Sequence, residues 1–129
     1  MSDFVFKTFD PVVFPVLLFV AIGGKRDDIA AKLKDFDGDP YYVNPNALDT
    51  SDALTYTECE NESGSYGTLV WLHTPSKATV KVVAHEATHA ASAIMKYVGI
   101  KADTENDETQ AYLVGFCADC IWKTLHPQE

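Results

Sequence analysis

Two histidines and a glutamate in one short stretch carry the clearest chemical signal in the sequence. The segment His85-Glu86-Ala87-Thr88-His89 matches the pattern H-E-x-x-H. In a helix, residues four apart lie about 40° apart around the axis and roughly 6 Å apart along it. Both imidazoles can therefore bind one zinc ion through nitrogen bonds of about 2.0–2.1 Å. Glu86 follows the first histidine and can act as the base that deprotonates a metal-bound water, so the pattern predicts a zinc-dependent hydrolase.

A catalytic zinc site also needs a third protein ligand and an open position for water. Because the helix supplies only two ligands, the third must come from a separate element that packs nearby. Glu108 and Glu105 are the candidates, since both lie at the start of the next helical stretch. They are three residues apart and share a similar helical face, so periodicity alone does not separate them.

The elements that must position these residues can be predicted from apolar patterns and turn residues. A continuous apolar run predicts a strand buried on both faces over Val12–Ile22, with Pro15 at a bulge or near its start. Leu54–Cys59 and Thr68–Leu72 predict two further strands, joined as a hairpin by a polar segment. A short amphipathic helix is expected over Lys25–Phe36.

Two long helices are expected at the end of the chain. The first, Lys77–Val98, carries the H-E-x-x-H pattern on an alanine- and valine-rich segment. The second begins at Asp103 or Thr104, which are favourable N-caps, and runs to about Leu125. Strands first and helices last indicate one α+β domain over residues 1–129, with helices packed on one side of a small sheet.

Composition restricts the partners and the compartment. A net charge of −9 disfavours nucleic acid, because phosphate binding relies on lysine and arginine. Cys59, Cys117 and Cys120 make an odd set that is typical of a reducing compartment, and the last two are interpreted as buried apolar thiols. The apolar run before Gly23 is too short to span a bilayer and contains Pro15. We therefore expect a cytoplasmic protein with neither a nucleic-acid nor a membrane partner.

The histidine and glutamate segments together resemble a known family. H-E-x-x-H followed by Glu108-Thr109-Gln110-Ala111-Tyr112 is similar to the gluzincin zinc metallopeptidases. The closer resemblance is to short peptidases of this kind from phages and prophages. It covers residues 66–116 and is loose over the N-terminal half. It implies a minimal zincin-like domain, in which a small sheet packs against the H-E-x-x-H helix and a second, C-terminal helix.

The same resemblance implies the roles of individual residues. His85, His89 and Glu108 would bind one Zn²⁺, and Glu86 would be the catalytic base, so Glu108 is favoured over Glu105. The strand at Thr68–Leu72 would border the cleft and pair with an extended peptide or protein substrate.

One departure from the family leaves two roles unassigned. Larger gluzincins often carry an aspartate four residues after the ligand glutamate, where it orients a histidine. Tyr112 occupies that position here. The group that stabilises the oxyanion is also not identified, and the candidates are Tyr112, His73, Tyr66 and His126.

Two other functions stay open. The scaffold could be a non-catalytic binding or assembly module that zinc stabilises as a structural clip. Glu86 argues against this alternative, because a purely structural site has no use for a base beside its ligand. The protein could also hydrolyse a non-peptide bond, such as an amide in a cell-wall or small-molecule substrate. An open coordination position facing a groove would indicate catalysis, and a fourth protein ligand a structural site.

Overall fold

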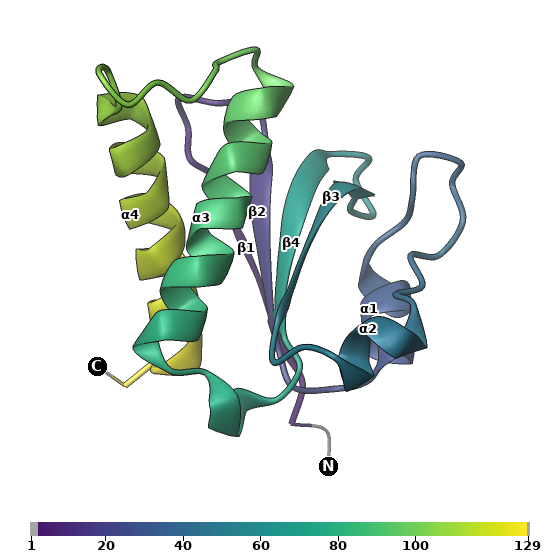
Figure 1. Cartoon of the computed structure of the whole chain (residues 1–129). Coiled ribbons are helices and arrows are strands. Elements are labelled where there is room, and N and C mark those ends of the chain that lie inside the picture. The colour runs from purple at the N-terminus through teal and green to yellow at the C-terminus, as the bar shows by residue number, and fades with distance from the viewer. Residues whose placement is uncertain (1–2, 129) are drawn as a thin grey trace.

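The computed structural model describes residues 3–128 and contains a four-stranded mixed sheet with helices on both faces (Figure 1). The α+β class expected from the sequence is confirmed. Along the chain the elements are β1 (Val5–Phe9), β2 (Leu17–Ile22), α1 (Arg26–Lys32), α2 (Pro45–Asp49), β3 (Leu54–Glu60), β4 (Tyr66–Leu72), the 3₁₀ turn η1 (Pro75–Lys77), α3 (Val80–Tyr97) and α4 (Glu108–Leu125).

The strands lie in the order β1-β2-β4-β3, with β2 and β4 parallel and the two outer pairs antiparallel. The hairpin predicted from Leu54–Cys59 and Thr68–Leu72 is confirmed, because β3 and β4 are consecutive and pair antiparallel. However, β4 is paired on both sides, so the expectation that Thr68–Leu72 borders a cleft is wrong. The two edges of the sheet are β1 and β3. An edge strand keeps unpaired backbone groups that a partner strand can use. Periodicity in the sequence does not reveal which strand lies at an edge.

The long strand expected over Val12–Ile22 is wrong at its start. β2 begins only at Leu17, and Val12 and Val13 are 83% and 73% exposed. These residues form the turn that returns the chain from β1, which the sequence patterns did not predict. The Asp10 carboxylate accepts a hydrogen bond from the Val12 amide at 2.7 Å within that turn. The chain must reverse here because β1 and β2 pair antiparallel.

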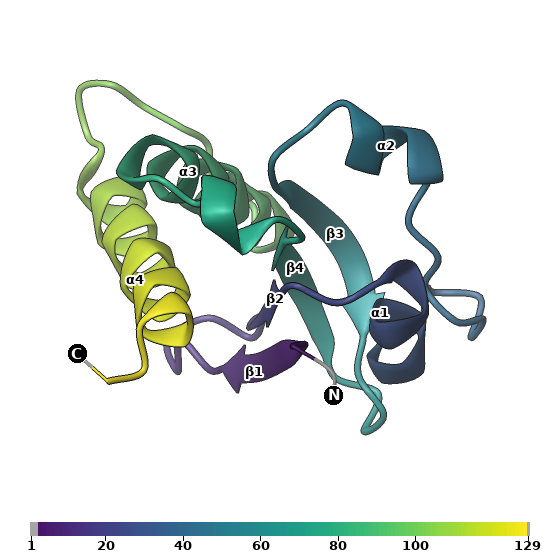
Figure 2. The same cartoon turned by 90° about the horizontal axis from the view of Figure 1, so that it is seen from below.

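The two faces of the sheet carry different helices, as the view from below shows (Figure 2). Val70 and Leu72 of β4 pack against α3 and α4, whereas Leu69 and Trp71 face α1 and α2. Side chains of a strand alternate between faces, so the central strands are buried on both. The expectation that the helices pack on one side is therefore wrong for α1 and α2, which cover the opposite face.

The two long helices lie side by side and run in opposite directions (Figure 1). α3 begins at Val80, where the Thr79 hydroxyl accepts a hydrogen bond from the Val82 amide at 3.3 Å. α4 begins at Glu108, later than the expected start at Asp103 or Thr104. Asp103 instead caps a turn, accepting from the amide of Glu105 at 3.0 Å. Within residues 3–128 no helix has the length and apolar character that crossing a bilayer requires.

Candidate functional site

The two histidines of α3 lie next to each other on its exposed side. Their Nε2 atoms are 3.1 Å apart, and the rings meet edge to face with centroids at 4.7 Å. Two zinc–nitrogen bonds of about 2.0–2.1 Å at a tetrahedral angle would place the nitrogens about 3.3–3.4 Å apart. The separation of His85 and His89 is therefore close to what a shared zinc ion requires. Without metal, the same separation suits a hydrogen bond from one ring N–H to the other ring nitrogen.

Glu86 faces away from solvent, toward β3. One step along a helix turns the side chain by about 100°, which takes Glu86 from the exposed side of His85 into the space between α3 and the sheet. Glu86 is only 7% exposed, and the Thr55 hydroxyl donates a hydrogen bond to its Oε1 at 2.8 Å. No hydrogen bond to Oε2 is found within residues 3–128. One carboxylate oxygen is therefore held in place and the other is free to accept a proton.

A groove between α3 and β3 connects these groups. It consists of two adjoining hollows, and Ala53, His85 and Glu86 line both of them. The hollow toward the start of α3 is completed by Ser51, Asp52, Lys81 and Val82. The hollow farther along is completed by Leu54, Thr55, Thr57 and His89. The histidines and the glutamate thus face a surface groove whose opposite wall is the edge strand of the sheet.

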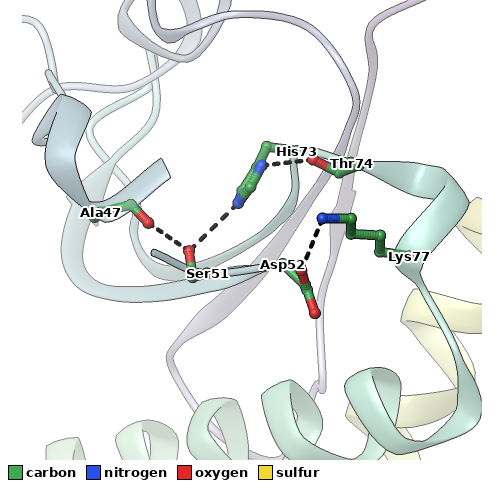
Figure 3. A network of polar contacts seen from close by, with 6 residues as sticks. All are labelled: Ala47, Ser51, Asp52, His73, Thr74 and Lys77. Carbon is green, nitrogen blue, oxygen red and sulfur yellow. Dashed lines mark hydrogen bonds and ion pairs between the residues drawn. The ribbon is translucent and has the colours of Figure 1, made fainter. Parts of the chain in front are cut away.

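A polar network supports the rim of this groove at the entry to β3 (Figure 3). His73, just after β4, has Nε2 at 3.4 Å from the Ser51 hydroxyl and Nδ1 at 3.0 Å from the Thr74 hydroxyl. The Ser51 hydroxyl donates to a backbone carbonyl of α2 at 2.5 Å. Lys77 and Asp52 add an exposed ion pair at 3.6 Å. These contacts join the α2–β3 connection to the segment that leads into α3.

His73 is half-buried in this network. Burial lowers the pKa of its imidazole, an effect that a hydrogen bond from the ring to the Ser51 backbone and the charges of Asp52 and Glu86 partly oppose. The neutral ring is therefore the stable form at neutral pH. His73 lines neither hollow beside the histidine pair.

The structure does not bring the two candidate third ligands to the histidines. Glu108 is the exposed first residue of α4, and Glu105 lies in the connection before it. The contact between α3 and α4 lies on another side of α3, around Val83 and Ala84. Within residues 3–128 no group of three His, Cys, Asp or Glu side chains could hold a metal ion. The ligand roles of Glu108 and Glu105 stay predictions.

The remaining candidates for oxyanion stabilisation are also separate from the groove. Tyr112 is 54% exposed on α4, the Tyr66 ring stacks on Tyr97 at 4.2 Å, and His126 contacts Trp122 at 4.1 Å. None of the three candidates lines either hollow. The oxyanion-stabilising group therefore stays unassigned.

All three cysteines are buried and unpaired, which confirms the burial predicted for Cys117 and Cys120. Burial raises the pKa of Cys59 and Cys117 to about 12 and that of Cys120 to about 11. All three thiols are therefore protonated at neutral pH and have no role in the groove.

Sequence analysis missed the residues of the opposite wall. Thr55 is a single threonine in an ordinary strand pattern, and its contact with Glu86 spans 31 positions of the chain. No local signal could have identified it. Ser51 and Asp52, which line the other hollow, likewise carry no local signal of a site.

Comparison with known proteins adds no further assignment. No protein-family model matches the sequence, and no curated protein or solved structure matches it either. The likeness to gluzincins therefore rests on the two sequence segments quoted above.

Proposed function

We propose that this chain is a zinc-dependent hydrolase that cleaves peptide bonds, with His85 and His89 as metal ligands and Glu86 as general base. One observation carries the proposal. The two exposed Nε2 atoms lie 3.1 Å apart, beside a groove that a buried carboxylate also lines. This arrangement leaves the other side of the metal position open, as a catalytic site needs.

The residues of the groove have distinct tasks in this reaction. Bound zinc would polarise the substrate carbonyl and lower the pKa of water toward about 7. The free oxygen of Glu86 accepts the proton of the attacking water and returns it to the leaving amine. The hydrogen bond from Thr55 holds the other oxygen, so the carboxylate keeps one orientation throughout.

The substrate lies along β3 in this proposal. An extended peptide can add to a sheet edge through backbone hydrogen bonds, which favours peptides without fixing their sequence. β3 is an edge strand, and its residues Leu54 and Thr55 line the groove with the histidines. β3 thus takes the role that the family resemblance gave to Thr68–Leu72.

The third metal ligand is the least supported part of the proposal. The resemblance assigns it to Glu108, with Glu105 as the alternative. Both side chains lie toward the far end of α3, because the start of α3 packs beside the end of α4. Zinc binding would therefore have to move the start of α4 together with the connection before it. Glu108→Ala and Glu105→Ala distinguish the two candidates. Only replacement of the true ligand should weaken zinc binding in competition with a chelator.

Metal analysis and turnover together test the function. We expect one zinc per chain in the wild type and its loss in His89→Ala, whereas the control His126→Ala keeps it. Glu86→Gln should keep zinc and lose peptide cleavage. A wild-type protein that binds no zinc, or a Glu86→Gln variant that cleaves as well as wild type, would contradict the proposal.

A non-catalytic, zinc-stabilised binding module is the second candidate, and one observation favours it. The bond between Thr55 and Glu86 ties α3 to β3, so Glu86 has a structural use even without catalysis. Such a module would bind zinc and show no turnover, and removal of zinc would lower its melting temperature.

A further inference from the structure

A further hollow lies on the face of the sheet that carries α1 and α2. The connection between these helices lies against β3 (Figure 1), and its segments 35–37 and 41–44 line the hollow together with Tyr56 and Glu58 of β3. The volume of this hollow is about 470 Å³, compared with about 240 and 340 Å³ for the two hollows beside the histidines. Sites for small ligands usually have volumes of about 300–1,000 Å³, so this hollow is large enough for a ligand.

Aromatic side chains line this hollow. The rings of Tyr41 and Tyr56 meet edge to face, with their centroids 5.8 Å apart. Tyr42 and Phe36 line it as well and stay 58% and 56% exposed. Single exposed aromatic residues are common, but several around one hollow are typical of a binding site. The faces of such rings are electron-rich and attract cations.

Carboxylates share the wall with the rings. Asp35, Asp37 and Glu58 line the hollow, and within residues 3–128 none of them forms an ion pair. In the same part of the chain no lysine, arginine or histidine lines it. Arg26 lies nearby, with its guanidinium carbon 5.8 Å from the centroid of the Tyr42 ring, but its Nε donates to a backbone carbonyl at 2.6 Å. The hollow therefore keeps an excess of negative charge.

A bulge in β3 brings Glu58 to this hollow. The register between β3 and β4 shifts between Tyr56 and Cys59, and the φ of Glu58 is 63°. A bulge re-aims side chains, and Glu58 lines the same hollow as Tyr56. Burial raises the pKa of Tyr41, and the charge of Glu58 adds to the increase. The negative charge of Glu58 thus acts on a neutral phenol of the same wall.

The carboxylates surround the hollow and do not converge on one point. A metal ion such as Ca²⁺ or Mg²⁺ needs several oxygen ligands at about 2.0–2.6 Å from a common centre. Within residues 3–128 no group of three His, Cys, Asp or Glu side chains could hold such an ion. An organic cation has different needs, because its apolar groups pack against aromatic rings while carboxylates attract its charge from a greater distance. The same carboxylates repel anions.

We propose that this hollow binds an organic cation, an ammonium or guanidinium group on an apolar stem, between the tyrosine rings and the carboxylates. Free amines and the side chains of lysine and arginine share this chemistry. The hollow lies on the opposite face of the sheet from the histidine pair, so the proposal does not depend on the zinc hydrolase function.

Titration of the full chain with choline and with its neutral isostere 3,3-dimethylbutan-1-ol tests the proposal. The two molecules have nearly the same shape, and only choline is charged. NaCl keeps the ionic strength constant, and NMR follows the amide chemical shifts. We expect saturable shifts that cluster at residues 35–44 and 56–58, and an affinity for choline at least about fivefold higher than for the alcohol. Equal affinities, or shifts that spread over the surface without saturation, would overturn the proposal.

Capped amino acids distinguish the sources of the cation. The methylamides of N-acetyl-lysine and N-acetyl-arginine present the same charge on a peptide unit. Tighter binding of either one than of choline supports a side chain of a polypeptide as the ligand, whereas tighter binding of choline supports a free small amine. Failure of all three cations to bind overturns the proposal.

Matched variants locate the site. Tyr42→Leu removes an exposed ring and keeps an apolar side chain, so the affinity for choline should fall about three- to fivefold. Tyr112→Leu removes a ring of α4 that is 54% exposed and should leave the affinity unchanged. Glu58→Gln should weaken binding, whereas Glu62→Gln, in the exposed β3–β4 turn, should not. Melting temperatures confirm that each variant folds. If Tyr42→Leu and Glu58→Gln bind choline as tightly as the wild type, this hollow is not the site.

Discussion

The contact between Thr55 and Glu86 should be one of the largest single polar contributions to the stability of this protein. It is a hydrogen bond of 2.8 Å to a carboxylate that is 7% exposed, and it joins α3 to β3. Thr55→Val removes the donor and leaves the carboxylate partly buried without its partner. Hydrogen bonds to charged groups contribute about 1.5–3 kcal/mol net, so we expect unfolding free energy to fall by about that amount.

Thermal unfolding at pH 7, followed by calorimetry, measures this change. For a domain of this size a loss of about 1.5–3 kcal/mol corresponds to a fall in Tm of roughly 6–12 °C. Thr55→Ser restores a hydroxyl and should recover most of the loss. Thr57→Val is the matched control, since Thr57 lies on the same strand and lines the same hollow but its hydroxyl makes no hydrogen bond within residues 3–128.

A double-mutant cycle attributes the effect to the contact. In a Glu86→Ala background the Thr55 hydroxyl keeps only its longer contact, at 3.4 Å, with the backbone carbonyl of residue 86, so Thr55→Val should cost clearly less than in the wild type. If Thr55→Val costs as much in that background as in the wild type, the loss does not come from the bond to Glu86. The position of the general base would then need another explanation.

Three further predictions follow from burial and packing. Gly67→Ala should destabilise the protein because the added Cβ would overlap an aromatic ring of β2, whereas Gly115→Ala has open space on a helix and should add about 0.5–1 kcal/mol in chemical denaturation. Cys117 and Cys120 should resist iodoacetamide at pH 8 in the folded protein and react once it is unfolded, since burial raises both thiol pKa values far above that pH; rapid native labelling would contradict their burial. Because the folded-state pKa of His73 is lowered, the unfolded chain binds its proton first, and stability falls as the pH drops below about 6.5. Between pH 7 and pH 5 the unfolding free energy of His73→Gln should fall less than that of the wild type. An equal fall in both proteins would show that His73 does not cause the pH dependence.

Local patterns predicted the elements that carry the site. The helix around the H-E-x-x-H segment and the strands after Leu54 and Thr68 show a strong apolar periodicity, which sequence alone expresses. The side-by-side placement of His85 and His89 follows from the four-residue spacing as soon as that helix forms. These predictions needed no knowledge of how the elements pack.

Predictions that depended on packing were less successful. Local patterns predict the strand at Thr68–Leu72 but do not show which strands pair with it. Its central place in the sheet could therefore not be predicted. The start of α4 at Glu108 depends on how the connection turns over the end of α3, and not on the N-cap preference of Asp103. Glu108 does not lie near the histidines for the same reason, because its place depends on where α4 begins.

The amino-acid sequence by itself determined an α+β chain with two imidazoles and a carboxylate on one helix, because spacing along a helix is a local property. Only the tertiary structure decided which strands lie at the edges of the sheet and that Thr55 holds Glu86. These features arise from contacts between segments far apart in the sequence. Hydrophobic burial and backbone pairing select such contacts for the whole chain together, and no single segment encodes them.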